Sequence, residues 1–326
     1  MSSTAKSTCF RRKNISDALF PIGNFPHRIL IPSEEVCQPL VNQLLLLTTW
    51  ILNRLPRAWA LALGRLLGAG LYLAMPYRKD VAWYNLLRAF PNLPPHRRRA
   101  ILRRTYQHFG MVLVDFVRIP AISAGRLGSI IDFDETHARE ARERGSGAVI
   151  MSGHVGNWEL LVPALALRGY PFIPVIVPQT GSGGPLVNAV RESTGSRYIS
   201  KRTPPRTMLR LLREGNFLGL LGDQDSRRNG VWVTFLGRPS SRPRGGAVFA
   251  LQTGAPMLAG WCILQNDGRY RLSFSPVCTE NLPRDRDRAA QTLTQRYTDA
   301  LEEAIRRHPE QYFWFHRMWK TQPPRS

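Results

Sequence analysis

From Ala148 onward, short apolar runs alternate with longer amphipathic segments. The short runs predict strands at residues 147–152, 171–177, 197–200, 217–222, 231–235, 256–264 and 270–277. The amphipathic segments predict helices at residues 157–168, 184–194, 204–214, 244–253 and 286–307. Such alternation is typical of a sheet that is covered by helices. The pattern therefore predicts an α/β fold with a mixed, mostly parallel sheet flanked by helices, within a domain at residues 79–322.

The pattern is different at the N-terminus. Residues 1–38 are rich in serine, proline and charge and have no period, which predicts a poorly ordered extension. Residues 39–78 carry two apolar helical runs with a break between them at Asn53–Pro56. Because a membrane span needs about 20 apolar residues, these runs predict membrane-associating helices in the bilayer interface. Two ordinary amphipathic core helices are the alternative.

Charge narrows the possible partners. The 326 residues include 45 Lys and Arg against 23 Asp and Glu, a formal net charge of +22, so the surface should attract phosphates. An arginine-rich stretch at His96–Arg104 is either a solvated helix face or a contact with lipid headgroups. No RNA- or DNA-binding signature occurs, so we expect an anionic membrane surface and no nucleic acid as a partner. The 4 scattered cysteines lack a CxxC pair and fit a reducing cytoplasm.

The candidate chemistry lies between the predicted strand at 147–152 and the predicted helix at 157–168. His154 stands there on a glycine-flanked turn, at the kind of sheet edge where α/β proteins bind ligands. Glu159 falls near the first helical turn, from which its carboxylate could return to the imidazole. Such a carboxylate fixes the imidazole tautomer, so His154 would act as a general base toward a hydroxyl. The alternative is that Glu159 merely complements the helix dipole.

A second acidic motif, Asp223-Gln-Asp225, follows the apolar run 217–222 and should emerge at a strand end. Two close carboxylates can bind a metal ion, but no third acidic ligand is near in sequence. We therefore expect no metal and no cofactor. A capped turn is the alternative explanation for Asp223.

Four ordered blocks resemble one family, the late acyltransferases of lipid A biosynthesis, which share the glycerolipid-type H-x4-(D/E) signature. The blocks are Asn85–Pro91, His154–Glu159, Gly222–Gly237 and Pro309–Lys320. Together they cover roughly residues 40–322. Two features depart from the family pattern: Met318 stands where a second arginine is common, and residues 1–35 match no block.

The resemblance implies direct transfer of a fatty acyl chain from a thioester of acyl carrier protein or coenzyme A to a hydroxyl of an anionic glycolipid. A lipid A precursor is the expected acceptor, at the cytoplasmic face of the cell inner membrane. By resemblance, His154 and Glu159 form the catalytic dyad, and Arg191, Asp223 and Asn157 bind or position substrate. We expect the backbone N–H groups of Val155 or Gly156 to stabilise the oxyanion.

Two alternatives stay open from the sequence. A lysophospholipid or a phosphoinositide mannoside could be the acceptor, because related acyltransferases share the signature. A catalytically silent, basic membrane-binding protein on the same scaffold is the alternative from a different class.

Overall fold

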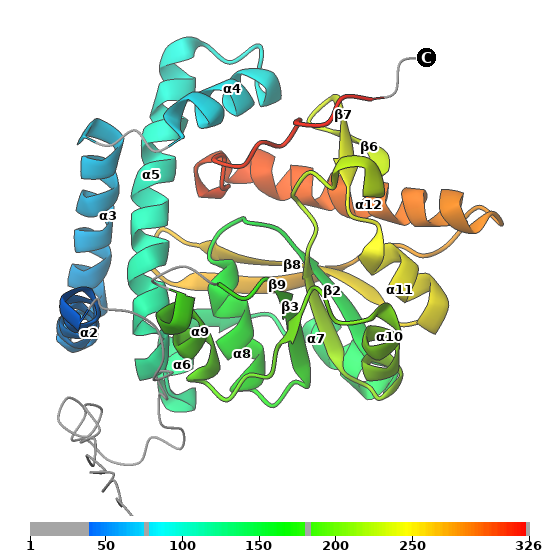
Figure 1. Cartoon of the computed structure of the whole chain (residues 1–326), viewed down its shortest axis with the longest axis horizontal. Coiled ribbons are helices and arrows are strands. Elements are labelled where there is room, and N and C mark those ends of the chain that lie inside the picture. The colour runs from blue at the N-terminus through cyan, green and yellow to red at the C-terminus, as the bar shows by residue number, and fades with distance from the viewer. Residues whose placement is uncertain (1–38, 75–77, 180–183, 324–326) are drawn as a thin grey trace, which may run out of the picture.

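The computed structural model describes residues 39–74, 78–179 and 184–323. The predicted extension at residues 1–38 lies outside the described part of the chain. Figure 1 shows helices from the first part of the chain, α3 and α5 among them, standing beside the sheet. The elements that precede the central strand are α2 (Pro39–Arg54), α3 (Arg57–Ala74), α4 (Lys79–Ala89), α5 (Pro95–Arg118), α6 (Ala124–Ile130), β1 (Ile131–Phe133) and α7 (Thr136–Glu143).

Helix α3 packs closely against α5, along which it lies in Figure 1. Glycine makes this approach possible: a Cβ atom added at Gly110 would lie 2.0 Å from the carbonyl oxygen of Gly64. One added at Gly68 would lie 2.1 Å from the carbonyl oxygen of Tyr106. Because backbone meets backbone here, no side chain can move aside to admit a larger residue. Helix α3 is therefore part of the folded unit on one side.

The opposite side of α3 is apolar and faces solvent. Trp59 is 71% exposed, Leu66 is 69% exposed and Leu73 is 78% exposed. Residues seven apart lie on the same face of a helix, so these three side chains form one exposed apolar stripe. Within the described residues no single helix has the length and hydropathy to cross a membrane; α3 and α4 meet that requirement only together, bent by 97° at their break.

A seven-stranded sheet forms the centre of the protein, in the order β1-β9-β8-β2-β5-β3-β4. All neighbouring pairs are parallel except β8 and β9, so the predicted mixed, mostly parallel sheet is confirmed. A separate antiparallel hairpin, β6-β7, lies beside it. The strands after β1 are β2 (Ala148–Ser152), β3 (Phe172–Ile176), β4 (Ile199–Ser200), β5 (Phe217–Leu221), β6 (Val231–Phe235), β7 (Arg238–Arg242), β8 (Met257–Leu264) and β9 (Tyr270–Pro276).

Alternate residues of β2 face two different cores, as the pleat of a strand requires. Val149 and Met151 pack in the larger core, which also contains residues of α4, α5, α10 (Pro205–Arg213), α11 (Gly245–Thr253) and α12 (Arg286–Arg307). Ala148 and Ile150 pack in the second core with α6, α7, α8 (Leu161–Ala166) and α9 (Gly184–Glu192). All five residues of β2 are buried, which explains the continuous apolar run in the sequence.

Most elements lie where the hydrophobic pattern predicts them, and α12 has the predicted bounds. The pattern misses β1, which is three residues long, and β7, whose residues Arg-Pro-Ser-Ser-Arg are polar although the last three are buried. The predicted helix at 157–168 is instead the 3-10 turn η2 (Trp158–Leu160) followed by α8. The arginine-rich stretch is not uniformly solvated, because Arg98 is buried and donates to the carbonyl oxygen of Phe90 at 3.1 Å.

Candidate functional site

Two neighbouring strands bring His154 and Asp223 together. Ser152, the last residue of β2, pairs with Leu221, the last residue of the parallel strand β5. His154 and Asp223 therefore each stand two residues beyond the end of this ladder. Parallel neighbours end at the same edge of the sheet, so the equivalent positions on the two chains lie side by side. The register thus decides which carboxylate meets the imidazole.

The contact between these residues is a direct hydrogen bond. Nδ1 of His154 lies 2.8 Å from Oδ1 of Asp223, and the backbone N–H of His154 donates to Oδ2 at 2.9 Å. Because the carboxylate only accepts, Nδ1 carries the proton and Nε2 is left with its lone pair. Both oxygens of Asp223 are therefore used to orient one residue, and Nε2 is the basic atom of the pair.

Burial and charge act in opposite directions on both groups. Burial lowers the pKa of His154, but the charge and hydrogen bond of Asp223, with the charge of Glu159, raise that pKa above its ordinary value. Burial likewise raises the pKa of Asp223, yet the His154 charge and hydrogen bonds bring it well below its usual range. Asp223 is therefore ionised at neutral pH although its side chain is 1% exposed.

Glu159 has a different partner from the one that the sequence predicts. Its Oε1 accepts from Nη2 of Arg191 at 2.6 Å, and its Oε2 accepts from Nε of Arg191 at 3.0 Å. The prediction that Glu159 hydrogen-bonds His154 is wrong, because η2 turns the Glu159 side chain toward α9 while β5 delivers Asp223 to the imidazole. Glu159 influences His154 through its charge.

Arg191 and Asn157, which the sequence predicts as substrate contacts, instead bind other side chains of the protein in this structure. The guanidinium of Arg191 is 18% exposed and is bidentate to Glu159, so its charge is largely neutralised. Asn157 is fully buried, and its Nδ2 donates to the hydroxyl of Tyr270 at 3.4 Å. Their predicted contacts with substrate stay predictions; in this structure the two side chains support the turn.

The backbone N–H groups of the turn are already used. Val155 N–H donates to the carbonyl oxygen of Gly153 at 2.8 Å, and Gly156 N–H donates to that of Gln311 at 2.9 Å. The expectation that these groups form an oxyanion hole is therefore wrong. Gly156 has φ +62°, and a Cβ atom there would lie 2.0 Å from the carbonyl oxygen of Cys262. The turn needs glycine at this position for both reasons.

Aromatic side chains surround the imidazole. The ring centroids of Trp158, Phe313 and His316 lie 4.7, 5.9 and 4.8 Å from that of His154. The C-terminal segment that supplies two of these rings is held by Asn85, whose Nδ2 donates to the carbonyl oxygens of Trp314 at 2.7 Å and His316 at 2.6 Å. The first and last of the four sequence blocks thus meet at the site.

A buried second histidine supports the same turn from the helical side. His108 of α5 lies with Nε2 3.2 Å from the carbonyl oxygen of Gly156, to which it donates. Burial lowers its pKa to about 4, against the opposite effect of that hydrogen bond, so His108 is neutral at neutral pH. It is a structural support for the turn.

The arrangement as a whole is suited to removing a proton from a hydroxyl. His154 offers a basic Nε2, Asp223 fixes the tautomer, and three aromatic rings lie around the imidazole. Sequence reasoning treated His316 as a packed structural residue and did not pair Asp223 with His154. The position of Asp223 directly after a buried strand is the one signal that could have indicated it.

Comparisons with known proteins agree over most of the chain. Residues 34–321 match the family model for bacterial lipid A biosynthesis acyltransferases. The chain is 29% identical over 192 residues to a phosphatidylinositol mannoside acyltransferase of Mycolicibacterium smegmatis, a match that covers 56% of this chain and 62% of that relative. It is 25% identical over 281 residues to the lipid A biosynthesis palmitoleoyltransferase of Escherichia coli, covering 84% of this chain and 89% of the relative. It is 24% identical over 284 residues to the lauroyltransferase of the same organism, with the same coverage.

Proposed function

Since this chain belongs to the bacterial lipid A biosynthesis acyltransferase family, we propose that it transfers a fatty acyl chain from a thioester to a hydroxyl of an anionic glycolipid, most simply a lipid A precursor. The observation that carries the proposal is the hydrogen bond of 2.8 Å between Nδ1 of His154 and Asp223, which leaves Nε2 as a base. The family supplies the reaction class, and this contact supplies the group that performs it.

The reaction needs one proton to move out and back. Nε2 of His154 takes the proton of the acceptor hydroxyl while the hydroxyl oxygen attacks the thioester carbonyl carbon. A new C–O bond forms, the C–S bond breaks, and the leaving sulfur receives the proton from Nε2 as a thiol. General-base catalysis by histidine produces an imidazolium. Asp223 stays ionised throughout and stabilises that positive charge. No covalent acyl-enzyme is needed.

Glu159 and Arg191 have a positioning role in this scheme. Their ion pair, 13% and 18% exposed, lies close enough for Glu159 to raise and Arg191 to lower the pKa of His154. The two effects are opposite because the two charges have opposite signs, and both act on the imidazole. We place the acceptor hydroxyl between this pair and Nε2, with Arg191 as a candidate contact for a polar group of the acceptor.

The proposal also includes the membrane. The donor is an acyl thioester of acyl carrier protein or coenzyme A, and the acceptor is a lipid of the cytoplasmic face of the inner membrane. The exposed apolar residues of α3, among them Trp59, Leu66 and Leu73, support interfacial binding of the protein. The net charge of +22 adds attraction to anionic lipid.

A phosphoinositide mannoside is the second candidate acceptor. The relative named as a phosphatidylinositol mannoside acyltransferase is more similar in sequence, at 29% identity, than the lipid A acyltransferases at 25% and 24%. That match is shorter, so it favours the same chemistry without deciding the acceptor. Both candidates are glycolipids that carry phosphate and free sugar hydroxyls.

The test uses purified full-length protein in detergent with each donor and each acceptor, and mass spectrometry of the lipid product. We expect transfer to at least one acceptor and a loss of about 10²–10⁴-fold in His154→Ala, the contribution of a positioned general base. Transfer by His154→Ala near the wild-type rate would reject the mechanism. If the wild-type protein shows no transfer and no slow thioester hydrolysis, that result would favour a catalytically silent binding protein. Lipid analysis of cells that lack the protein then identifies the acceptor.

A further inference from the structure

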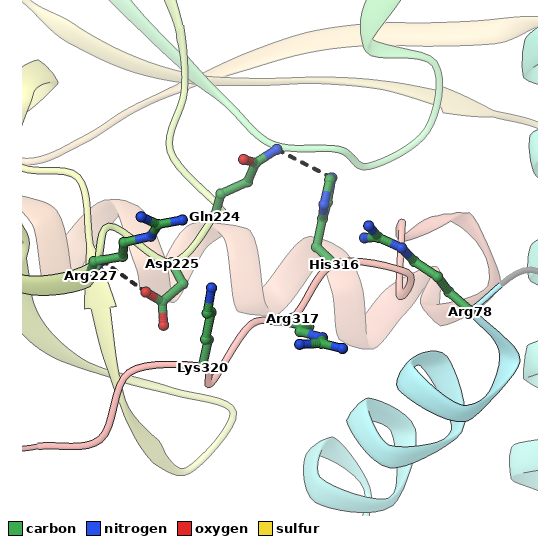
Figure 2. Close-up of a pocket in the computed structure, with 7 residues that line it drawn as sticks. All are labelled: Arg78, Gln224, Asp225, Arg227, His316, Arg317 and Lys320. Carbon is green, nitrogen blue, oxygen red and sulfur yellow. Dashed lines mark hydrogen bonds between the residues drawn. The ribbon is translucent and has the colours of Figure 1, made fainter.

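A cationic cavity of ≈ 270 Å³ opens beside the candidate site. Figure 2 shows that three distant segments form it: the start of α4, the loop after β5, and the segment after α12. In Figure 2 the guanidinium of Arg78 and the amine of Lys320 project into the space between these segments. The lining residues are Arg78, Gln224, Asp225, Arg227, His316, Arg317 and Lys320.

The one carboxylate that lines this cavity is held by backbone and hydroxyl donors. Asp225 accepts from the backbone N–H of Thr321 at 2.9 Å, from the hydroxyl of Thr321 at 2.7 Å and from the backbone N–H of Arg227 at 2.8 Å. It therefore ties the C-terminal segment to the loop. None of the ion pairs between described residues involves Arg227, Arg317 or Lys320. Four cations and one carboxylate leave an excess of three positive charges, which attracts an anion.

Two of the cations stand on backbone that disfavours an ordinary side chain. Arg78 has φ 51° and Arg227 has φ 56°, and among the described residues only two other non-glycine residues, Leu236 and Asn281, have positive φ. Residues in this left-handed region are held by their surroundings and gather at ligand sites. At Arg227 the surroundings are identified: Asp225 accepts its N–H, and the hydroxyl of Ser241 donates to its carbonyl oxygen at 2.6 Å.

The cavity adjoins the proposed catalytic site through His316. The ring of His316, which lines it, lies 4.8 Å from the ring of His154, and Nε2 of His316 lies 3.2 Å from Nε2 of Gln224. Burial, with the charges of His154 and Arg78, lowers the pKa of His316 to about 4, although Asp223 has the opposite effect. His316 is thus neutral at neutral pH, and the arginines and the lysine carry the positive charge of the cavity.

We propose that this cavity is a phosphate-binding subsite that holds the phosphate group of one substrate while its reacting group lies at His154. Guanidinium groups bind phosphate in bidentate fashion, and a lysine ammonium contributes a point charge. The phosphate can come from the sugar of the glycolipid acceptor or from the phosphopantetheine arm of the donor. The subsite deepens the proposed acyl transfer and rests on it.

The experiment separates the two sources. Full-length protein in detergent is assayed with acceptor that carries or lacks its phosphate, and with acyl-coenzyme A or the acyl-pantetheine that has no phosphate. Arg317→Ala and Lys320→Ala are compared with Arg228→Ala, which removes an exposed arginine outside the cavity. We expect each cavity variant to raise KM about tenfold or more for the phosphorylated form of one substrate. The value of kcat, and the KM for the form of that substrate without phosphate, should stay unchanged.

Each outcome has one meaning. An effect confined to phosphorylated acceptor assigns the subsite to the acceptor, and an effect confined to acyl-coenzyme A assigns it to the donor. Equal KM values for the cavity variants and Arg228→Ala would overturn the subsite while the transfer reaction stands. If wild-type protein transfers nothing, the proposed function fails, and calorimetric titration with inorganic phosphate decides the cavity alone. Binding weakened about tenfold by Lys320→Ala would support it, and binding equal in wild type and variant would reject it.

Discussion

The choice of Asp223 over Glu159 as the partner of His154 gives a sharp prediction. Replacement of Asp223 by Asn leaves one acceptor oxygen where the structure uses two, one for the imidazole at 2.8 Å and one for the backbone N–H of His154 at 2.9 Å. If the amide oxygen serves the backbone, its NH2 group faces Nδ1. The imidazole then adopts the tautomer with the proton on Nε2, in which the base is lost.

The magnitude follows from this tautomer change. We expect kcat to fall about 10⁴-fold in Asp223→Asn, as for a triad carboxylate replaced by its amide, which is about 5.5 kcal/mol of transition-state stabilisation. Glu159→Gln leaves the His154–Asp223 contact intact and should lose far less, at most about 10²-fold. The order of the two variants distinguishes the structural pairing from the pairing that the sequence predicts.

The pH profile supplies a second readout that simple misfolding would not produce. His154 must be neutral to accept a proton, so activity falls as pH drops through its raised pKa. Without the charge of Asp223 the burial effect dominates and that pKa falls, so the residual activity of Asp223→Asn should persist to lower pH. The assay is transfer to detergent-dispersed acceptor between about pH 5 and 9, with ¹⁵N NMR of the imidazole to report the tautomer. Half the wild-type rate in Asp223→Asn, or a larger loss in Glu159→Gln, would refute the pairing.

Three further predictions address stability and membrane binding. Gly110→Ala should lower the free energy of unfolding by about 2 kcal/mol or more, because the added Cβ lies 2.0 Å from the Gly64 carbonyl oxygen. Gly70→Ala in the exposed interior of α3 meets nothing within 4 Å and should instead raise it by about 0.5–1 kcal/mol in the same denaturant titration. His108 has a pKa of about 4 in the folded protein and binds a proton more readily in the unfolded state, so acidification from pH 6.5 to about 4 should cost up to about 3 kcal/mol of stability. In urea titrations across this pH range, His108→Gln should flatten the dependence of the unfolding free energy on pH. An unchanged dependence would contradict the prediction. Trp59→Ala combined with Leu66→Ala should weaken vesicle flotation at high salt, because apolar burial does not depend on salt while attraction between charges is screened within about 10 Å. Flotation equal to wild type would place the membrane contact elsewhere on the protein.

Several features of this protein are determined by the local pattern of residues. Buried parallel strands need uninterrupted apolar residues, so β2 and β5 are visible in the sequence with nearly their observed bounds. Helix α12 begins after Asp285, whose side chain accepts the N–H of Arg288, and its amphipathic period gives the observed bounds. His154 is visible as the polar residue on a glycine turn at a strand end. The family resemblance follows from four local blocks in a fixed order and is confirmed over residues 34–321.

Tertiary structure decided what those residues do. Whether His154 meets Glu159 or Asp223 depends on β5 being the neighbour of β2, and β5 follows β2 only after β3 and β4 in the sequence. Strand order and register are set by packing of the whole domain and cannot be deduced from the spacing of residues along the chain. The cationic cavity likewise joins Arg78, the loop after β5 and the segment after α12, three segments that share no local pattern. Spacing along the chain limits which side chains can meet through one turn, but contacts between strand ends exist only once the sheet has formed.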